Sequence, residues 1–523
     1  MNTERISGGG ARCSSVFIRG SDLAVVALIA LGAFAFLLAT SRGYGIFRDE
    51  LYYIACSEHL ALGYVDHPPL SILLLWLVRR TLGDSLPALR CLASAAVATS
   101  VFLAGLIARE LGGGRGAQVL AAVAVMCAPV LLAFGHFYSM NAFDLLFWTI
   151  LVLLAVRILR RDQPRGWLLF GAVAGLGLEN KYSVGFLVFG LVAGLLLTPQ
   201  RRHLRSAWLW IGGALALVIF LPHLWWQVRT GWPSLEFMAR ATAEKNLPMS
   251  PQGFFAQQIL LLDPAALPLW LAGLLALLLA PAMAPVRALG WAYVAVFVLF
   301  VTQRAKPYYL APIYPLLFAA GAVAMESVCA RRGWRWALPA FTATVVAVGV
   351  LTVPMAVPVL PVETFIAYQH AIGIGPPQME RNRPGALPQV FADMHGWTEL
   401  VETVGRAYDQ LPADRRARAV VLVTNYGEAG AIDFLGRARG LPRAISGHNN
   451  YWLWGPGDLR RDDTVIAVGF PRDSLLEGFD DVVQVDTVRC EYCMPYQNDL
   501  PVHLARGLKA PIDELWSRLK RFV

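Results

Sequence analysis

The chain has 523 residues, of which 56% are hydrophobic and only 15% are charged. Soluble globular proteins carry about 25% charged residues, so this composition excludes an ordinary soluble enzyme and predicts a polytopic membrane protein. The formal net charge of +9 does not indicate nucleic-acid binding, because the arginines fall in short runs between apolar segments, as the positive-inside rule describes.

The apolar segments predict about eleven transmembrane helices, since about 20 apolar residues are needed to cross a bilayer. They lie near residues 22–40, 86–108, 117–135, 141–159, 166–180, 183–198, 207–227, 259–280, 288–303, 308–326 and 335–357. The first is interpreted as a membrane helix and not as a cleaved signal, because its apolar run opens a series of spans. Arg5, Arg12 and Arg19 precede it.

With a cytoplasmic N-terminus, nearly all the short arginine clusters between spans lie on the cytoplasmic side, which supports the count and the orientation. The loop 41–85, the loop 228–258 and the region from about 358 then lie outside. Within the first loop, the short apolar stretch 70–83 predicts a helix lying in the membrane interface, with Arg79 and Arg80 at the headgroups.

The region after residue 358 is polar and changes in character. Strand-like runs at 419–425, 463–470 and 482–490 alternate with helix-like stretches at 398–411 and 428–439, which predicts a small α/β domain. We therefore expect a transmembrane domain over 1–357, a linker over 358–395 and an extracytoplasmic α/β domain over 396–523.

Two acids, Asp49 and Glu50, follow the first predicted span in the motif RDELYY. Adjacent helical residues point about 100° apart, so the two cannot face one atom. One can act on a substrate while the other orients a partner or a metal. A carboxylate in a partly dry site is a suitable general base. The structural alternative is that Asp49 caps a short surface helix.

The motif GYVDHPPL places Asp66 and His67 before two prolines that fix an extended backbone. This pattern is compatible with substrate binding or support of Asp49, and equally with a helix start. A third polar group, His136, Asn141 and Asp144, lies where the third span turns into the fourth. Asp144 is costly near the bilayer without a partner, and an ion pair with Lys181 would supply one, although a helix cap is the alternative.

Lysine is rare before residue 358: Lys181, Lys245 and Lys306 are its three positions there, all on the predicted outer side. Cations facing a cavity at the outer ends of helices suit an anionic phosphate. Either lysine alone would fit snorkelling to headgroups. The combination of Lys181, Lys306 and the neighbouring Arg304 favours phosphate binding.

Two cysteines, Cys490 and Cys493, form a pair in the sequence RCEYCMPY. A disulfide and two free thiols remain open alternatives. A zinc site would need two more ligands.

Together the motifs RDELYY, GYVDHPPL, SMNAFD, NKYS and KPYYLAPIYP, over roughly residues 20–330, resemble the polyprenyl-phosphate-sugar-dependent glycosyltransferases of the GT-C fold. This group includes protein O-mannosyltransferases, the aminoarabinose transferases of lipid A and bacterial family 39-type proteins. The C-terminal motifs NYGEAGAI and SGHNNYWLWGP resemble the extracytoplasmic domain of the same bacterial group. The oligosaccharyltransferase motif WWDYG is absent.

The resemblance implies an inverting transfer of one sugar from a polyprenyl-phosphate donor to an acceptor hydroxyl outside the cytoplasmic (inner) membrane. Asp49 matches the acid that deprotonates the acceptor, Glu50 its partner, and His67 a residue lining the site. Lys306 with Arg304 matches the residues that meet the lipid phosphate, and Lys181 a weaker basic position. Tyr308 and Tyr309 of the KPYY motif join this substrate-binding set.

The acceptor implied is a glycan, lipid or protein of the cell envelope. No cofactor is required by these residues, although Asp49, Glu50 and His67 could hold a divalent metal. The alternative from another class is a transporter or lipid flippase, which also places charges among many helices. Transporters often contain two homologous halves, and the sequence shows no internal repeat.

Overall fold

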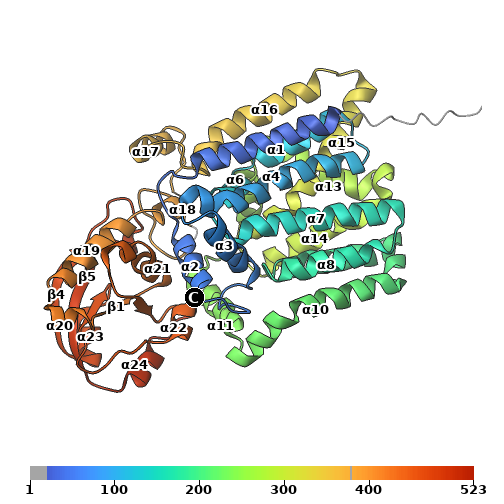
Figure 1. Ribbon diagram of the computed structural model, residues 1–523. Helices are drawn as coiled ribbons and strands as arrows, with labels where there is room; N and C mark the ends of the chain where they lie inside the picture. The colour runs from blue at the N-terminus through green and yellow to red at the C-terminus, as the bar shows by residue number, and fades with distance from the viewer. Residues whose placement is uncertain (1–20, 377, 379) are drawn as a thin grey trace, which may run out of the picture.

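The computed structural model describes residues 21–376, 378 and 380–523, so Arg5, Arg12 and Arg19 lie outside the described residues. Figure 1 shows a bundle of long helices and, at one end of it, a smaller domain that contains the β-strands. The two parts correspond to the predicted transmembrane and α/β domains.

Among the described residues, seven helical segments are long and apolar enough to cross a membrane, which confirms the prediction of a multi-pass membrane protein. They contain α1 (Ser21–Thr40), α4 (Leu86–Glu110), α7 (Met140–Arg161), α10 (Ala207–Thr230), η4 (Pro281–Val286) with α14 (Arg287–Thr302), η5 (Pro307–Ile313) with α15 (Tyr314–Arg332), and α16 (Ala337–Thr352) with η6 (Val353–Met355).

Three further helix pairs pass the same test but are bent, which raises the count of spans to at most ten. They are α5 (Arg115–Cys127) with α6 (Pro129–His136), α9 (Val184–Leu196) with η1 (Pro199–Arg205), and α12 (Pro251–Leu261) with η3 (Pro264–Ala266) and α13 (Leu267–Leu279). A proline opens the helix after each break, where its missing N–H costs nothing. The predicted number of eleven is not confirmed, because α8 (Gly166–Leu178) is too short to count.

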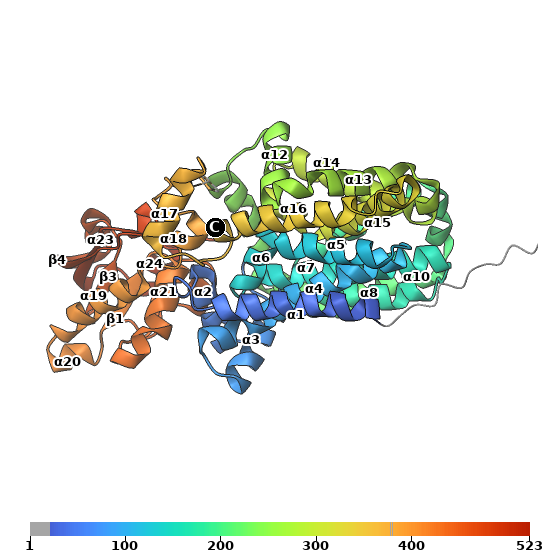
Figure 2. The same ribbon diagram turned by 90° about the horizontal axis from the view of Figure 1, so that it is seen from above.

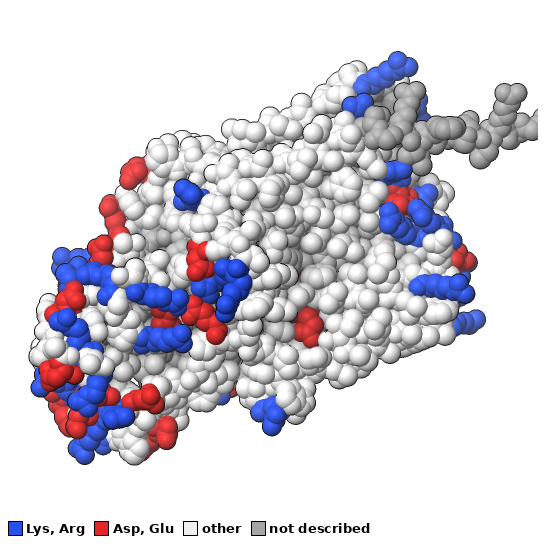
Figure 3. All heavy atoms as spheres, in the orientation of Figure 1, with Lys and Arg blue, Asp and Glu red and all other residues white. Residues whose placement is uncertain are grey.

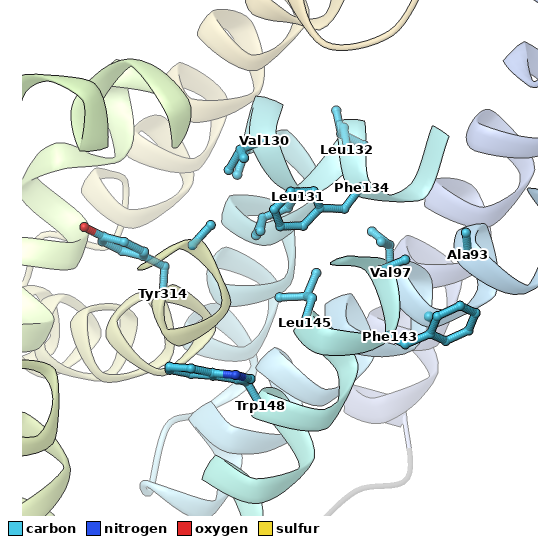
Figure 4. Close-up of a cluster of buried hydrophobic side chains, with 14 of the residues drawn as sticks. Ala93, Val97, Val130, Leu131, Leu132, Phe134, Phe143, Leu145, Trp148 and Tyr314 are labelled. Carbon is cyan, nitrogen blue, oxygen red and sulfur yellow. The ribbon is translucent and has the colours of Figure 1, made fainter. Parts of the chain in front are cut away.

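The surface agrees with a membrane location. Figure 3 shows a broad band almost free of charge between the C-terminal domain, where both signs mix, and an opposite end rich in basic residues. Inside the bundle, α4, α6, α7 and α15 pack through fully buried side chains such as Val97, Leu131, Leu145, Trp148 and Tyr314 (Figure 4). This packing fixes the ends of the helices that carry the candidate site.

Short helices occupy the end of the bundle that faces the C-terminal domain, as Figure 1 shows for α2, α3 and α11 and Figure 2 for α2 and α3. They are α2 (Arg48–Glu58), α3 (Leu70–Thr81), α11 (Pro233–Arg240) and η2 (Ala241–Lys245). The helix expected over 70–83 is therefore confirmed as α3. Leu73 and Leu77 of α3 are about half exposed, at 49% and 50%, as an amphipathic helix at an interface requires.

The C-terminal domain contains a five-stranded sheet with the order β2-β1-β3-β5-β4. Its strands are β1 (Val420–Val423), β2 (Ala444–Ser446), β3 (Val465–Val468), β4 (Phe479–Val488) and β5 (Leu500–Leu508). The pairs β1–β2 and β1–β3 are parallel, whereas β5 is antiparallel to β3 and β4. Its helices are α19 (Trp397–Asp409), α20 (Ala413–Arg416), α21 (Tyr426–Phe434), η7 (Gly436–Arg439), α22 (Asn450–Trp454), α23 (Arg472–Gly478), η8 (Pro495–Gln497) and α24 (Ile512–Arg518).

The three strands predicted from the sequence correspond to β1, β3 and β4, while β2 and β5 were not expected. The segment expected as a linker contains α17 (Val362–Ala371) and α18 (Gln389–Ala392), and buries Phe365 and Phe391 in a small apolar cluster. Cys490 and Cys493 are free thiols, with the Cys493 amide donating to Cys490 Sγ at 3.2 Å.

Candidate active site

The two adjacent acids at the first turn of α2, Asp49 and Glu50, have different surroundings. Glu50 is buried, with 1% of its surface exposed. Its Oε1 accepts from Arg90 Nε at 2.8 Å and from the Tyr138 amide at 2.7 Å, while Oε2 accepts from Arg90 Nη2 at 2.6 Å and from the Phe47 amide at 2.9 Å. Both oxygens are therefore saturated, which gives Glu50 a structural task and argues against the catalytic role suggested by the sequence.

Asp49 faces the other way and remains accessible. Its Oδ1 accepts a hydrogen bond of 2.9 Å from the Tyr426 hydroxyl and lies 3.5 Å from Arg48 Nε. The side chain is 36% exposed. Within the described residues no donor is within hydrogen-bonding distance of Oδ2, so this oxygen is available to accept a proton from a substrate.

Two glycines of α21 allow Tyr426 to reach Asp49 from a position 377 residues further along the chain. A Cβ atom on Gly430 would lie 2.8 Å from the backbone of Leu51, and one on Gly427 would lie 2.4 Å from the Arg48 side chain. These distances are too short for any larger residue. The absence of side chains at both positions brings α2 and α21 into direct contact.

Arg48 links this carboxylate to the segment between the two domains. Its Nη1 lies 3.3 Å from Asp393 Oδ2 and donates to the Tyr496 hydroxyl at 2.6 Å. Asp393 is 1% exposed. Burial raises the pKa of Asp393 to about 6, although the positive charge of Arg48 opposes this shift.

Two lysines, Lys245 and Lys306, lie on either side of the Glu380 carboxylate. Lys306 Nζ donates to Glu380 Oε1 at 2.8 Å, and Lys245 Nζ lies 3.6 Å from the same oxygen. Burial would raise the pKa of Glu380, but the charges of Lys245 and Lys306 hold that pKa at about 2. Glu380 is thus an ionised carboxylate clamped by two ammonium groups.

The acid of α2 and the cations before α15 belong to one connected group of side chains. Gln389 Nε2 lies 3.2 Å from Glu380 Oε2 and 3.4 Å from Asp393 Oδ2, which joins the lysine cluster to Arg48 and Asp49. Burial lowers the pKa of Lys245; the Glu380 carboxylate is the largest opposing charge, Arg48 adds to the shift, and Asp49 opposes it. The sequence motifs at 48–50 and 306–309 therefore meet, through residues of 380–393.

The GYVDHPPL motif lines the same face of α2. The Tyr52 hydroxyl lies 3.0 Å from Asp66 Oδ1 and 2.9 Å from Asn450 Oδ1, and Asp66 is 18% exposed. His67 is fully buried, stacks on Tyr53 with ring centroids 4.8 Å apart, and has Nδ1 3.0 Å from the Pro68 carbonyl. His67 shapes the wall of the site, whereas Asp66 is open to it.

The expected ion pair between Lys181 and Asp144 is present, with Nζ 3.4 Å from Oδ2. Lys181 also donates to Asn141 Oδ1 at 2.7 Å and lies 5.0 Å from the ring centre of Tyr309 and 5.9 Å from that of Tyr308. Lys181 therefore lies among Asp144, Asn141 and the two tyrosines, which follow Lys306 closely in the chain.

Two predicted residues lie apart from these groups. His136 is buried at the end of α6, and within the described residues neither ring nitrogen has a hydrogen-bond partner. Arg304 is exposed, lies two residues after the end of α14 with a positive φ of 52°, and pairs with no carboxylate in the described part of the chain. Its position does not support the phosphate-binding role expected from the sequence.

The structure adds residues that the sequence did not single out. Lys245 stood out as a third outer lysine without an assigned role. Asn450 lies in the C-terminal motif SGHNNYWLWGP and Tyr426 in NYGEAGAI. The resemblance of these motifs to an extracytoplasmic domain was the one sequence signal for the two residues. Glu380 and Asp393 belong to the segment expected to be a linker, and nothing in their local sequence indicates a site.

The Asp393 pKa leads to a test of this arrangement. Its value in the folded protein, about 6, exceeds the ordinary 3.8, so between these pH values the folded form holds a proton that the unfolded form releases. The Asp393 contribution to stability therefore falls as pH rises through this window, by about 3 kcal/mol in all. Thermal unfolding at about pH 4 and about pH 6.5 should show the native protein losing stability relative to Asp393→Asn. A constant difference between the two proteins would contradict this.

Known protein sequences are similar to part of this chain. Residues 66–226 match the family described as dolichyl-phosphate-mannose-protein mannosyltransferase. The lipopolysaccharide core galacturonosyltransferase RgtB of Rhizobium johnstonii is 27% identical over 223 residues, which are 42% of this chain and 44% of that protein. The chain thus matches less than half the length of this curated relative.

The fold is that of a solved membrane protein. ArnT from Cupriavidus metallidurans, solved in its apo state and bound to undecaprenyl phosphate, superposes with a TM-score of 0.57 over 92% of this chain and 97% of ArnT, at 15% sequence identity. This protein therefore has the GT-C fold. Together with the sequence matches, the fold supports a membrane glycosyltransferase, the class that the sequence motifs resemble.

Proposed function

We propose that the protein transfers a single sugar from a polyprenyl-phosphate donor to a hydroxyl group of a cell-envelope acceptor. The observation that carries this proposal is the connection of an accessible carboxylate, Asp49, to a partly buried pair of lysines at the end of a membrane bundle, through Arg48, Asp393, Gln389 and Glu380. A sugar linked to phosphate and an acceptor hydroxyl need these two groups side by side.

Asp49 is the proposed general base. The Tyr426 hydroxyl and Arg48 hold Oδ1, which leaves Oδ2 to receive the proton of the acceptor hydroxyl. Tyr426 and Arg48 also fix the rotamer of the Asp49 side chain, so Oδ2 is held in one orientation. Fixed geometry of this kind supplies much of the rate gained by a positioned base.

The proposed phosphate site is the position that Glu380 occupies. A carboxylate and a phosphate offer similar oxygen acceptors to ammonium groups, and Glu380 Oε1 lies between Lys306 and Lys245. A donor phosphate would take the place of this carboxylate, and Lys181, beside Tyr308 and Tyr309, would contribute positive charge.

The proposed reaction conserves charge and atoms. The acceptor O–H bond breaks and its proton moves to Asp49, the acceptor oxygen forms a bond to the anomeric carbon, and the bond from that carbon to the phosphate oxygen breaks. Polyprenyl phosphate leaves with an added negative charge, which Lys306 and Lys245 stabilise. Attack from the face opposite the phosphate inverts the anomeric carbon.

The donor and the location rest on related arguments. The solved structure of ArnT holds undecaprenyl phosphate, and this chain has the same fold with basic residues at the bundle end. The opposite end of the bundle is rich in basic residues, and the positive-inside rule assigns such an end to the cytoplasmic side. The Lys306 end of the bundle and the C-terminal domain would then lie outside the inner membrane. No step above requires a metal; among the described residues, no group of three potential ligands clusters.

A donor screen tests the proposal. The purified full-length protein is incubated with membrane extract and a panel of radiolabelled polyprenyl-phosphate sugars. We expect label from one donor to enter a glycan, lipid or protein fraction. If every donor remains intact while the protein moves lipid between the leaflets of vesicles, the flippase alternative replaces this proposal.

The lysine cluster gives a separate prediction. Lys306→Ala removes a charge-assisted hydrogen bond worth about 1.5–3 kcal/mol, so the KM for the donor should rise about 10- to 100-fold with a smaller change in kcat. Lys509→Ala, which removes a lysine from the far part of the C-terminal domain, is the control. A fall in kcat with unchanged KM would mean that Lys306 acts on the transition state and not in donor binding.

A further inference from the structure

A charged cavity lies away from Asp49, at the other end of α2. It has a volume of about 640 Å³ and lies between α2, α3 and the C-terminal domain. Its lining contains four arginines and two acids, namely Arg79, Arg80, Arg437, Arg443, Glu58 and Asp84. The proposed transfer reaction uses none of these side chains. We refer to it below as the arginine cavity.

The two acids of the arginine cavity are already engaged. Asp84 Oδ1 accepts from Arg79 Nε at 2.6 Å. Glu58 is shared by Arg79 at 3.1 Å, Arg437 at 2.8 Å and Arg443 at 3.7 Å. Two carboxylates thus face four guanidinium groups, and the cavity keeps a formal charge of +2, the difference between the four arginines and the two acids.

The surplus charge is on Arg80 and Arg443. Arg80 lies 5.7 Å from the ring centre of Trp76, and no carboxylate within the described residues forms an ion pair with it. Arg443 has 69% of its side chain exposed, lies 3.7 Å from Glu58, and has Nη1 3.4 Å from His59 Nε2. Most of the N–H donors of both side chains are free for an anion.

The arginine cavity also lies beside apolar surface. Leu60 lines it and is 48% exposed, and Leu73 and Leu77 of α3 are 49% and 50% exposed. A helix with leucines on one face and with Trp76 and Arg80 beside them is typical of the membrane interface. We therefore expect the cavity to open at the level of the lipid headgroups.

We propose that the arginine cavity binds the phosphate or carboxylate headgroup of a membrane lipid whose acyl chains lie against the leucines of α3. Guanidinium groups bind both anions through paired N–H donors. The leucines supply the contact with lipid that a soluble anion cannot use. This proposal does not depend on the proposed glycosyl transfer, because binding needs no sugar donor.

Lipid binding is measured on the full-length protein in detergent by native mass spectrometry, with phosphatidic acid or phosphatidylcholine as the probe. Native protein should bind phosphatidic acid at least about tenfold more tightly than phosphatidylcholine, since each charged hydrogen bond contributes about 1.5–3 kcal/mol. The double variant Arg80→Gln/Arg443→Gln should lose this preference. Its arginines make few internal contacts, so we expect it to fold.

The chain supplies a matched control in a cavity of about 600 Å³ on the C-terminal domain, which contains Arg406 and Arg489 with three acids. Arg406→Gln/Arg489→Gln should keep the preference for phosphatidic acid. Equal loss in both double variants, or none in the first, would overturn the proposal. So would soluble glycerol 3-phosphate binding as tightly as phosphatidic acid, because the lipid chains would then contribute nothing.

Discussion

Asp49→Asn should abolish sugar transfer while leaving donor binding intact. A positioned general base contributes about 10²- to 10⁴-fold to the rate, and asparagine cannot accept the proton. The amide keeps the size of the carboxylate and can still accept from the Tyr426 hydroxyl, so the contact between α2 and α21 should remain. The measurement is kcat with labelled donor, together with donor affinity in the absence of acceptor.

Asp462→Asn is the control for this variant, since Asp462 is exposed in the C-terminal domain. Tyr426→Phe provides an intermediate case. It removes the hydrogen bond to Oδ1 but leaves the carboxylate, and should reduce kcat by less than Asp49→Asn does. Transfer by Asp49→Asn at the native rate would mean that another group takes the proton.

The sequence predicted the membrane bundle well because hydrophobic segments are a local signal. A run of about 20 apolar residues has few alternatives to a membrane helix. The number of spans was less certain, because the bends after Cys127, Leu196 and Leu261 depend on how each short helix packs. Within the C-terminal domain, β5 was missed because Pro501 and Gly507 weaken its strand pattern.

The candidate site was predicted in part, for a related reason. Asp49, Asp66, Lys181 and Lys306 stood out because a charge near the bilayer is costly and needs a purpose. Glu380 and Asp393 lie in a polar segment, where acids are ordinary. Glu380 belongs to the site through its contact with Lys306, and Asp393 through its contact with Arg48. Contacts between segments so far apart in the chain cannot be predicted from the local sequence.

For Glu50 the sequence led to the opposite kind of error. The residue was predicted to belong to the catalytic pair because its charge is unusual near the bilayer, but its contacts are structural. Its four hydrogen bonds join α2 to Arg90 of α4 and to the Tyr138 amide before α7. Arg90 is fully buried and also donates to the carbonyl groups of Ser41 and Gly45, after α1. This one ion pair therefore connects the ends of three membrane helices to the helix that carries Asp49.

Arg90→Met should consequently destabilise the protein by about 3–5 kcal/mol, because it leaves the buried Glu50 carboxylate without its cation. Thermal unfolding in detergent measures this loss. Arg518→Met removes an exposed pair with Glu514, in which the two side chains are 62% and 54% exposed, and should cost less than about 1 kcal/mol.

Activity then separates the two roles of the acidic pair. With Glu50→Gln, the fraction of protein that remains folded should keep a kcat within about tenfold of native, far from the 10²- to 10⁴-fold loss expected when a catalytic base is removed. A stable Glu50→Gln protein without activity would show that Glu50 takes part in the reaction. Loss of stability with retained turnover would leave Asp49 as the acid that meets the substrate, held in place by its neighbour.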